Sequence, residues 1–339
     1  MNEFSLILLK WFRENGRDLP WRKTSDPYAI WLSEIILQQT QVKQGWDYWE
    51  RFMRRWPTVD LLAAASEDEV LREWQGLGYY SRARNLHFAA KQIGEMGGFP
   101  TTLEGIKSLK GVGDYTAAAI GSIAFGLPAA VVDGNVYRVL SRHFGISTPI
   151  NTTEGKKEFA LLAQNLLLPA LDRAGQGAGL YNQAIMDFGA IQCTPSSPRC
   201  ADCPLMETCM AFREGRVAQL PVKLKTLKVK ERRLTYVYVR YQGETAIRRR
   251  GKGDIWQGLY EPLLFEEESS LSPLTTYLSP LKKNVKHVLT HRILWADFFL
   301  WEPAERPQLP ENYFWIKEAE LDDFAKPRLV EILLDNLIS

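Results

Sequence analysis

All four cysteines of this 339-residue chain lie within seventeen positions, in the stretch CTPSSPRCADCPLMETC from Cys193 to Cys209. Their spacing is Cys-x6-Cys-x2-Cys-x5-Cys, with Cys200 and Cys203 as the close pair. A disulfide scaffold is not expected in a chain of this size without a secretory signal, so the cluster predicts a metal site. Thiolates suit both structural zinc and an iron–sulfur cluster, and the spacing alone leaves these two alternatives open.

The length of the chain predicts two or more domains, because 339 residues exceed the usual size of one hydrophobic core. Apolar residues make up 45% and charged residues 24%, which is typical of a globular protein and excludes the disordered and fibrous classes. The uncharged stretch at residues 116–132 is interrupted by glycine and proline and is too short to span a membrane. The N-terminus carries Glu3 and lacks the cleavage site of a secretory signal, so we expect a cytosolic protein.

Helical signals dominate the first two hundred residues. Asp26 and Pro27 form a helix start, and the helical spacing of apolar side chains over residues 35–56 predicts one continuous helix up to Trp56. Ser66 and Glu69 form a capping box. Further helices are expected over residues 102–109, 115–125, 135–144, 153–168 and 179–190. The first two thirds of the chain are therefore predicted to be all-α.

After residue 213 the pattern changes. Runs of β-branched and aromatic residues at 233–241, 259–265 and 293–301 predict the strands of a second, mixed α/β domain. Residues 213–252 contain 13 basic and 3 acidic side chains, whereas residues 253–339 contain 8 basic and 15 acidic ones. The basic block is either a solvated linker or a segment that runs along a polyanion, because clustered Lys and Arg attract phosphates.

A tight turn between two predicted helices lies in LKGVGDYTAAAI, residues 109–120. Gly111 and Gly113 let the backbone approach a ligand closely, and the amides that open the next helix point outward at the positive end of its dipole. Such a turn seats a phosphate, although an αα corner that only needs glycine shows the same pattern.

The cysteine loop and this turn together resemble the endonuclease III superfamily of DNA glycosylases. The resemblance implies a [4Fe-4S] cluster held by Cys193, Cys200, Cys203 and Cys209. In that superfamily the cluster holds a basic loop against DNA and does not cleave the bond. The resemblance further implies a helix-hairpin-helix and DNA phosphate contacts from Arg199, Gly111, Val112 and Gly113.

Two more segments, WLSEIILQQTQV at residues 31–42 and VVDGNVYRVL at 131–140, resemble the MutY-type adenine DNA glycosylases of that superfamily. A lone Glu34 on an apolar helix is more often a surface residue, and Asp133 alone is an ordinary N-cap. Glycoside hydrolysis, however, uses one protonated carboxyl group for the leaving group and one ionised carboxylate for the cationic sugar. The resemblance implies Glu34 as the acid and Asp133 as the ionised partner, with Asn135 and Tyr115 nearby. Apolar neighbours are expected to raise the Glu34 pKa by about two to three units.

The position of Tyr115 bears on the type of reaction. Strand-cleaving members carry a Schiff-base lysine there, so the resemblance implies a glycosylase without efficient strand cleavage. The target adenine must leave the stacked duplex for this chemistry. The resemblance implies that Trp21 and Arg22 line the base pocket and that Gln39 and Tyr79 wedge into the stack. Further expected DNA contacts are Gln38, Thr40, Leu77, Gly78 and Asp187, the last standing where the family more often has the longer Glu.

Residues 234–339 resemble the Nudix-like domain attached to MutY enzymes, with WQGLYEP at 256–262 as the clearest landmark. No Glu-x-x-Glu-Glu box is present in this part of the sequence, so nucleotide hydrolysis is not expected. The resemblance implies that the segment HVLTHR reads the base opposite adenine. Leu289, Thr290 and His291 stand where the family commonly has Phe-Ser-His, so an aromatic wedge is missing but a hydroxyl is kept.

These features predict an all-α helix-hairpin-helix region at residues 1–212, with a six-helix module at about 22–132 and an iron–sulfur module formed by about 1–21 and 133–212. A basic linker at 213–233 and an α/β Nudix-like domain at 234–339 are expected to follow. The predicted function is base-excision repair, in which adenine opposite 8-oxoguanine or guanine is removed from duplex DNA. A monomer in the cytoplasm, associated with the nucleoid of a bacterium and with other repair proteins, is expected. The alternatives are a pyrimidine glycosylase like endonuclease III, disfavoured by Tyr115 and Glu34, and a non-catalytic iron–sulfur redox sensor that binds DNA.

Overall fold

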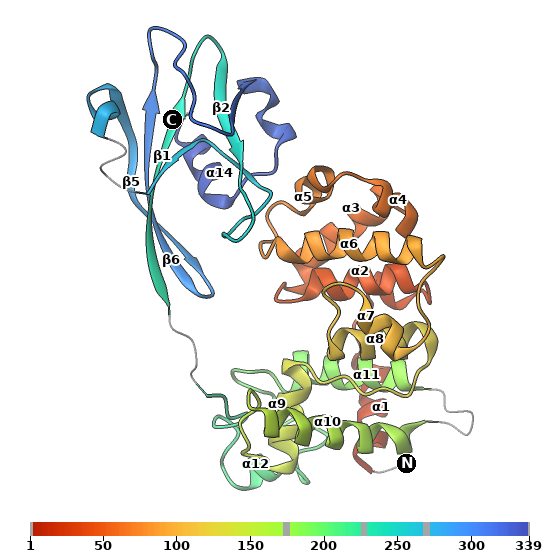
Figure 1. The fold of residues 1–339 in the computed structure, drawn as a ribbon. Coiled ribbons are helices and arrows are strands. Elements are labelled where there is room, and N and C mark those ends of the chain that lie inside the picture. The colour runs from red at the N-terminus through yellow and green to blue at the C-terminus, as the bar shows by residue number, and fades with distance from the viewer. Residues whose placement is uncertain (1–2, 172–176, 225–228, 267–271, 338–339) are drawn as a thin grey trace. The chain divides into compact units, whose positions relative to one another are not determined.

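The computed structural model describes residues 3–171, 177–224, 229–266 and 272–337. Contacts group the chain into two compact units, residues 1–63 with 88–225, and residues 64–87 with 226–339. The first unit is helical, and the second combines helices with two sheets (Figure 1). Among the described residues every strand lies after Val229, as predicted for an all-α region followed by an α/β domain.

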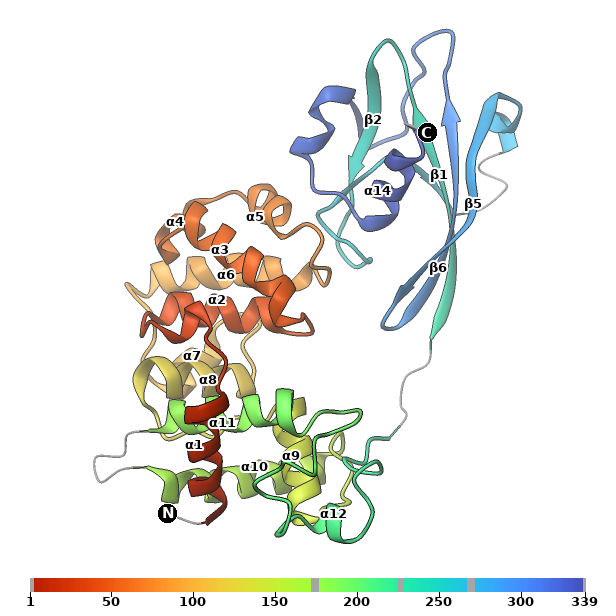
Figure 2. The ribbon, with the colours of Figure 1, turned by 180° about the vertical axis from the view of Figure 1, so that it is seen from behind.

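The first unit is built from helices that bury a shared apolar core. Its elements are α1 (Glu3–Asn15), η1 (Pro20–Arg22), α2 (Pro27–Leu37), α3 (Val42–Arg55), α4 (Val59–Ala64), α7 (Leu103–Ser108), α8 (Asp114–Phe125), α9 (Gly134–Phe144), α10 (Thr153–Leu167), η2 (Leu168–Ala170), α11 (Ala178–Asp187), η3 (Phe188–Gln192) and α12 (Met210–Arg213). Figure 2 shows α1 lying beside α10 and α11. Leu8, Phe159 and Ile185 from these three helices are fully buried together, which fixes α1 against the later part of the chain.

The single helix predicted from Pro27 to Trp56 is wrong. The structure has α2 ending at Leu37 and α3 beginning at Val42. Between them Gln39 adopts a φ of +56°, a left-handed conformation that no α-helix contains. α2 is buried on all sides and α3 on one side, and the helical spacing of apolar residues in the sequence continues across the short break between them. The spacing alone therefore did not reveal the interruption.

The second unit holds two sheets. Its elements are α5 (Glu67–Trp74), the first part of α6 (Ser81–Glu95), β1 (Lys230–Val239), β2 (Glu244–Arg249), β3 (Tyr260–Glu261), β4 (Leu263–Phe265), η4 (Ser272–Tyr277), β5 (Leu278–Leu289), β6 (Arg292–Trp301), β7 (Tyr313–Lys317), η5 (Glu318–Asp323) and α14 (Arg328–Asp335). The sheet orders are β4-β1-β6-β5 and β3-β2-β7. β1 runs parallel to β6, and the β5–β6 hairpin pairs Leu289 with Arg292. Thr290 and His291 therefore form the tip of this hairpin.

The three predicted strand runs correspond to β1, to β3 with β4, and to β6. β2, β5 and β7 were not predicted. β5 carries exposed Lys282, Lys283 and Lys286, and β2 ends in two arginines, so neither shows the apolar alternation that marks a strand. Pairing with β6 and β7 respectively makes these segments strands.

From Arg232 onward the basic block belongs to a folded domain and is not a solvated linker. Arg232 pairs with Asp254 and Glu266, and Arg250 pairs with Asp254 and Glu261. Carboxylates of the second unit also pair with Arg240, Arg248 and Arg249. The basic side chains from residue 232 onward are thus largely neutralised inside a folded domain. Residues 225–228 of the predicted linker lie outside the described residues. Within the described residues, no helix has both the length and the apolar character to cross a membrane.

Candidate active site and cysteine loop

Glu34 lies on α2, a helix whose residues from Tyr28 to Ile36 are all buried. The Asp26 carboxylate caps the helix by accepting a hydrogen bond from Tyr28 N at 3.0 Å, and Pro27 occupies the first turn, as predicted. Glu34 itself is only 9% exposed, and its Oε2 accepts a hydrogen bond of 2.8 Å from the Tyr115 hydroxyl. The alternative of an ordinary surface glutamate is therefore wrong.

The surroundings of Glu34 favour its protonated form. The pKa of Glu34 is raised to about 7, chiefly by burial and also by the negative charge of Asp133, although the hydrogen bond from Tyr115 and the charge of Arg22 lower it. Burial, with the charges of Glu34 and Asp133, also raises the Tyr115 pKa well above its ordinary value. The three side chains therefore interact at one site, to which α2, α8 and the start of α9 each contribute one.

Asp133 is the N-cap of α9 and is held by three hydrogen bonds. Its Oδ1 accepts from Asn135 N at 2.9 Å and Val136 N at 2.8 Å, and its Oδ2 accepts from Asn135 Nδ2 at 2.7 Å. Burial raises the Asp133 pKa above its ordinary value, and these bonds, with the charge of Arg138, oppose the rise. Three donors directed at the carboxylate stabilise its ionised form. Burial thus acts on both carboxyl groups, but three hydrogen-bond donors oppose it at Asp133 and one opposes it at Glu34.

Arg22 is held beside this site by Asp187. The Arg22 guanidinium donates to both Asp187 oxygens, at 2.7 and 2.8 Å, and Arg17 donates to the same carboxylate through its backbone N and its side chain. Burial raises the pKa of Asp187, but these hydrogen bonds outweigh it and hold the pKa below its ordinary value. Asp187 is fully buried, so in this structure it anchors two arginines. Trp21 is buried too, with its ring packed against those of Trp46 and Trp49.

Arg138 was missed from the sequence and joins the acid site to the cysteine loop. Its Nη2 donates to Asn135 Oδ1 at 2.8 Å, while its Nε donates to Cys193 O at 2.7 Å. Glycine at position 189 lets η3 pack closely against the start of α9, because a Cβ there would lie only 2.6 Å from the Asn135 Cβ. Arg142, one turn further along α9, was missed as well and donates to Thr194 O at 2.7 Å. The i, i+4 spacing of two arginines on a helix that starts at Asp133 is the sequence signal that could have found them.

The four cysteines line one cavity together with Arg142 and Arg199. Burial raises the Cys203 pKa to about 11, with the charges of the other three thiols adding to the effect. Within the described residues no three His, Cys, Asp or Glu side chains already form a metal-binding group. Four thiols around a single cavity are nevertheless a donor set that fits an iron–sulfur cluster or zinc. Arg199 is exposed on the same loop, and its Nη2 donates to Ile191 O at 3.0 Å.

The glycine turn lies between α7 and α8, as predicted for a helix-hairpin-helix. Gly111 has a φ of +80°, which explains the glycine, and Val112 packs inward with 8% exposure. Gly113 is the N-cap of α8 and has an extended backbone, which any residue can adopt. The backbone conformation therefore does not explain the glycine at this position. A Cβ at Gly113 would meet nothing within 4 Å, so this position faces open space, as a ligand contact requires. As a glycine, Gly113 has no side chain with which to cap α8.

The two predicted wedge residues share an unusual backbone. Gln39 and Tyr79 have φ values of +56° and +47°, both left-handed without being glycine, and both side chains are exposed. Gln38 is the C-cap of α2 and donates to Thr116 Oγ1 at 3.3 Å, while Thr40 follows in the same turn. Such strained conformations persist where surrounding contacts hold them, and they concentrate at functional sites.

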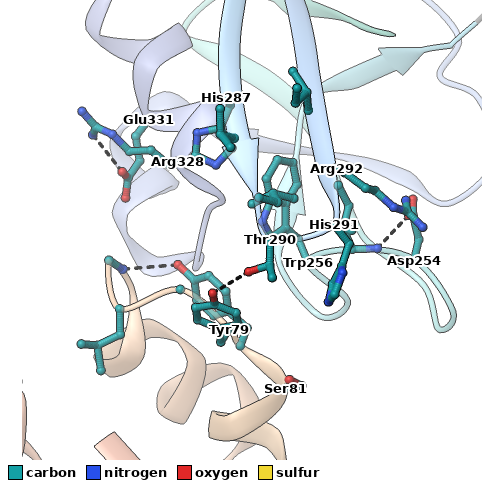
Figure 3. A pocket seen from close by; sticks show the side chains of 18 of the residues that line it. Tyr79, Ser81, Asp254, Trp256, His287, Thr290, His291, Arg292, Arg328 and Glu331 are labelled. Atoms are coloured by element: carbon teal, nitrogen blue, oxygen red, sulfur yellow. Dashed lines mark hydrogen bonds and ion pairs between the residues drawn. The ribbon is translucent and has the colours of Figure 1, made fainter. Parts of the chain in front are cut away.

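A second cavity, of about 980 Å³, lies in the second unit. Figure 3 shows Thr290 and His291 at its rim, with Tyr79 opposite, and the hydroxyls of Tyr79 and Thr290 are 2.7 Å apart. Leu77, Gly78 and Leu289 also line the cavity. Leu289 is partly buried and also packs against the apolar core of the C-terminal sheet.

The comparisons with known proteins cover both parts of the chain. Residues 32–164 match the HhH-GPD superfamily base excision DNA repair protein model, and residues 235–336 match a NUDIX domain model. An adenine DNA glycosylase of Buchnera aphidicola subsp. Schizaphis graminum is 37% identical over 76% of this chain and 73% of that protein. Its counterpart from Buchnera aphidicola subsp. Acyrthosiphon pisum is 30% identical over 98% of this chain and 97% of that protein. The solved structure of a thermostable thymine-DNA glycosylase has a TM-score of 0.56 and 32% identity, covering 62% of this chain and 95% of that one.

Proposed function

Because the chain belongs to the adenine DNA glycosylase family of helix-hairpin-helix base-excision-repair proteins, we propose that it hydrolyses the N-glycosidic bond of adenine mispaired with 8-oxoguanine or guanine in duplex DNA. The observation that carries this proposal is the pair of carboxyl groups at one site, with a Glu34 pKa of about 7 and a hydrogen-bonded Asp133. In this proposal Glu34 carries the proton and Asp133 carries the charge, because three donated hydrogen bonds favour the ionised form of Asp133.

In the proposed mechanism Glu34 donates its proton to a ring nitrogen of the extruded adenine. The protonated base leaves with the bonding electrons, and an oxocarbenium-like sugar develops at the anomeric carbon. The Asp133 carboxylate stabilises this cation until water adds to the carbon, and the ionised Glu34 accepts the proton of that water. Tyr115 holds the Glu34 carboxyl group in place through its hydroxyl. Because Tyr115 carries no amine, release of the base involves no Schiff base.

Base extrusion supplies the substrate to this site. Adenine in a stacked duplex is out of reach, so it leaves the stack while protein side chains fill the gap. Gln39 and Tyr79, exposed in left-handed conformations, are proposed to fill it. The helix-hairpin-helix residues Gly111 to Gly113 and the exposed Arg199 are proposed to hold the phosphates on either side. Trp21 and Arg22 are proposed to bound the base pocket. In a bacterium such an enzyme is expected in the cytoplasm on nucleoid DNA, as a monomer.

A single-turnover assay tests this function. Duplexes with adenine opposite 8-oxoguanine, adenine opposite guanine and an oxidised pyrimidine are each incubated with excess protein, and base release is measured. Rapid release of adenine alone is the expected result. Release of the oxidised pyrimidine instead would indicate an activity like that of endonuclease III, and tight binding without any release would indicate a non-catalytic sensor.

A [4Fe-4S] cluster is the proposed occupant of the cysteine cavity, where it supplies a rigid centre for the DNA-binding loop that bears Arg199. Purified protein is expected to contain iron and sulfide in equal amounts. Cys203→Ala is expected to lose the iron and to weaken duplex binding by about tenfold or more, because the loop loses its anchor. Metal analysis and binding titrations check this. Zinc in place of iron, or full affinity without metal, would contradict it.

Thr290 and His291 are proposed to read the base opposite adenine. Replacing both by alanine is expected to lower the preference for 8-oxoguanine over guanine by about tenfold, because a lost hydrogen bond to the lesion typically costs one to three kcal/mol. Single-turnover rates on the two duplexes give this ratio. Lys283→Ala, which alters an exposed residue of the same hairpin away from its tip, is the matched control. An unchanged ratio in the double variant would remove these residues from the proposal.

A further inference from the structure

The loop between α5 and α6, residues 76–80, is flanked on both sides by residues that are hydrogen-bonded to the C-terminal domain. Before the loop, the Gln75 side chain accepts from Lys326 N at 3.0 Å and donates to Glu331 Oε1 at 2.7 Å. After it, the Arg84 guanidinium donates to Gln257 O at 2.7 Å. All of these residues belong to the second compact unit.

The loop itself has little regular structure, and its conformation includes strain. Gly76, Gly78 and Tyr79 have φ values of +97°, +71° and +47°. Glycine adopts a positive φ without strain, so of these three only Tyr79 has a sterically strained backbone. Inside the loop Trp74 Nε1 donates to Gly78 O at 3.0 Å, which supports the turn. A side chain in a strained turn keeps its direction only when the flanking segments are fixed. The hydrogen bonds of Gln75, just before the loop, and of Arg84, just after it on α6, fix the two segments that flank Tyr79.

The amide of Gln75 is matched to both of its partners. Its oxygen accepts from the backbone N–H of Lys326, and its nitrogen donates to the Glu331 carboxylate. A glutamate in place of Gln75 could still accept from Lys326 N, but it would be repelled by Glu331. Glu331 is held in turn by Arg328 at 3.0 Å, and Figure 3 shows this pair at the edge of the cavity. α5 also meets the C-terminal domain elsewhere, since Arg249 pairs with Glu67 at 2.8 Å.

We propose that Gln75 and Arg84 are positioning residues, through which the C-terminal domain holds the loop that bears Leu77 and Tyr79 in the conformation needed to extrude adenine. The inference rests on the proposed function and deepens it, because it makes base extrusion depend on the C-terminal domain as well as on the catalytic region. Neither residue touches the reacting atoms. Their loss is expected to slow extrusion while the protonation behaviour of Glu34 stays the same.

The test uses the full chain and a duplex with 2-aminopurine as the fluorescent target base opposite 8-oxoguanine, with Glu34→Gln present to prevent base release. Gln75→Glu is expected to slow the fluorescence rise by about tenfold, because it places two carboxylates side by side. Glu331→Gln keeps the acceptor and is expected to remain within about threefold of the parent. Combining the two restores a donor–acceptor pair, so the double variant is expected to return to within about threefold as well. Arg84→Met loses the hydrogen bond to Gln257 O and is also expected to slow the fluorescence rise.

Arg72→Ala is the matched control. Arg72 pairs with Asp323 at 3.1 Å, an exposed ion pair that also joins α5 to the C-terminal domain but does not flank the loop. It is expected to leave extrusion unchanged, and thermal melting verifies that all variants fold. The inference would be overturned if Gln75→Glu extruded the base at the parental rate, or if the double variant did not recover that rate. An equal loss of rate in Arg72→Ala would overturn it as well. With Glu34 intact, absence of adenine release alongside a normal extrusion signal would instead refute the proposed function.

Discussion

Glu34→Gln is expected to lower the single-turnover rate of adenine release by about a thousandfold to ten-thousandfold, the range typical of losing a general acid. Glutamine keeps the size of the side chain and an oxygen that accepts the hydrogen bond of the Tyr115 hydroxyl. It has no proton to give to the base. Duplex affinity is therefore expected to change by less than about threefold, and electrophoretic or fluorescence titration measures it.

Folding stability provides an internal control for this variant. The Glu34 pKa rises from 4.5 to about 7 on burial, so the folded state binds a proton that the unfolded state has lost between these pH values. Stability therefore falls as the pH rises through this interval, by about 3 kcal/mol in total. Glu34→Gln removes the titration and is expected to be more stable than the parent at pH 8, with a smaller difference at pH 5. Urea unfolding at both pH values checks the sign.

The pH dependence of catalysis has the same origin. Only protonated Glu34 donates to the base, so the rate is expected to fall as the pH rises above about 7. A rate that stays constant between pH 6 and pH 9, or near-full activity in the glutamine variant, would falsify the assignment of Glu34 as the acid.

Asp133→Asn is expected to lower the rate of adenine release by about a hundredfold to a thousandfold, as is typical when one stabilising group of a developing charge is removed. Asparagine caps a helix about as well as aspartate, and its Oδ1 can still accept from Asn135 N and Val136 N. α9 is therefore expected to remain intact, which separates loss of charge from loss of structure. Circular dichroism and iron content verify this, because α9 also holds the cysteine loop through Arg138.

Asp26→Asn is the matched control for the cap. Asp26 accepts from Tyr28 N at the start of α2, so the change replaces an N-cap aspartate in the same way on the helix that carries Glu34. It is expected to retain activity within about threefold. If Asp133→Asn were as active as the parent, the sugar cation would need another source of stabilisation, and the two-carboxylate mechanism would be wrong.

Local patterns in the sequence predicted much of the fold and part of the site. The capping box at Ser66 and Glu69 forms as predicted, with the Ser66 hydroxyl bonded to Glu69 N at 3.2 Å. Gly111 is needed for its positive φ, and Asp133 caps α9. These features depend on residues within one or two turns of each other, so the order of amino acids determines them directly.

What only the tertiary structure decided is which distant groups meet. Burial in the packed fold, together with the charge of Asp133, gives Glu34 its raised pKa, and the hydrogen bond from Tyr115 lowers it in part. The pairing of Asp187 with Arg17 and Arg22 is equally invisible in the sequence. Packing sets the partners of such buried polar groups, because each must find a hydrogen bond or an opposite charge wherever the fold places it. The sequence by itself therefore determined most of the helices, the caps and the residue types of the site, whereas the fold decided where α2 and α3 separate and which partners the buried polar groups have.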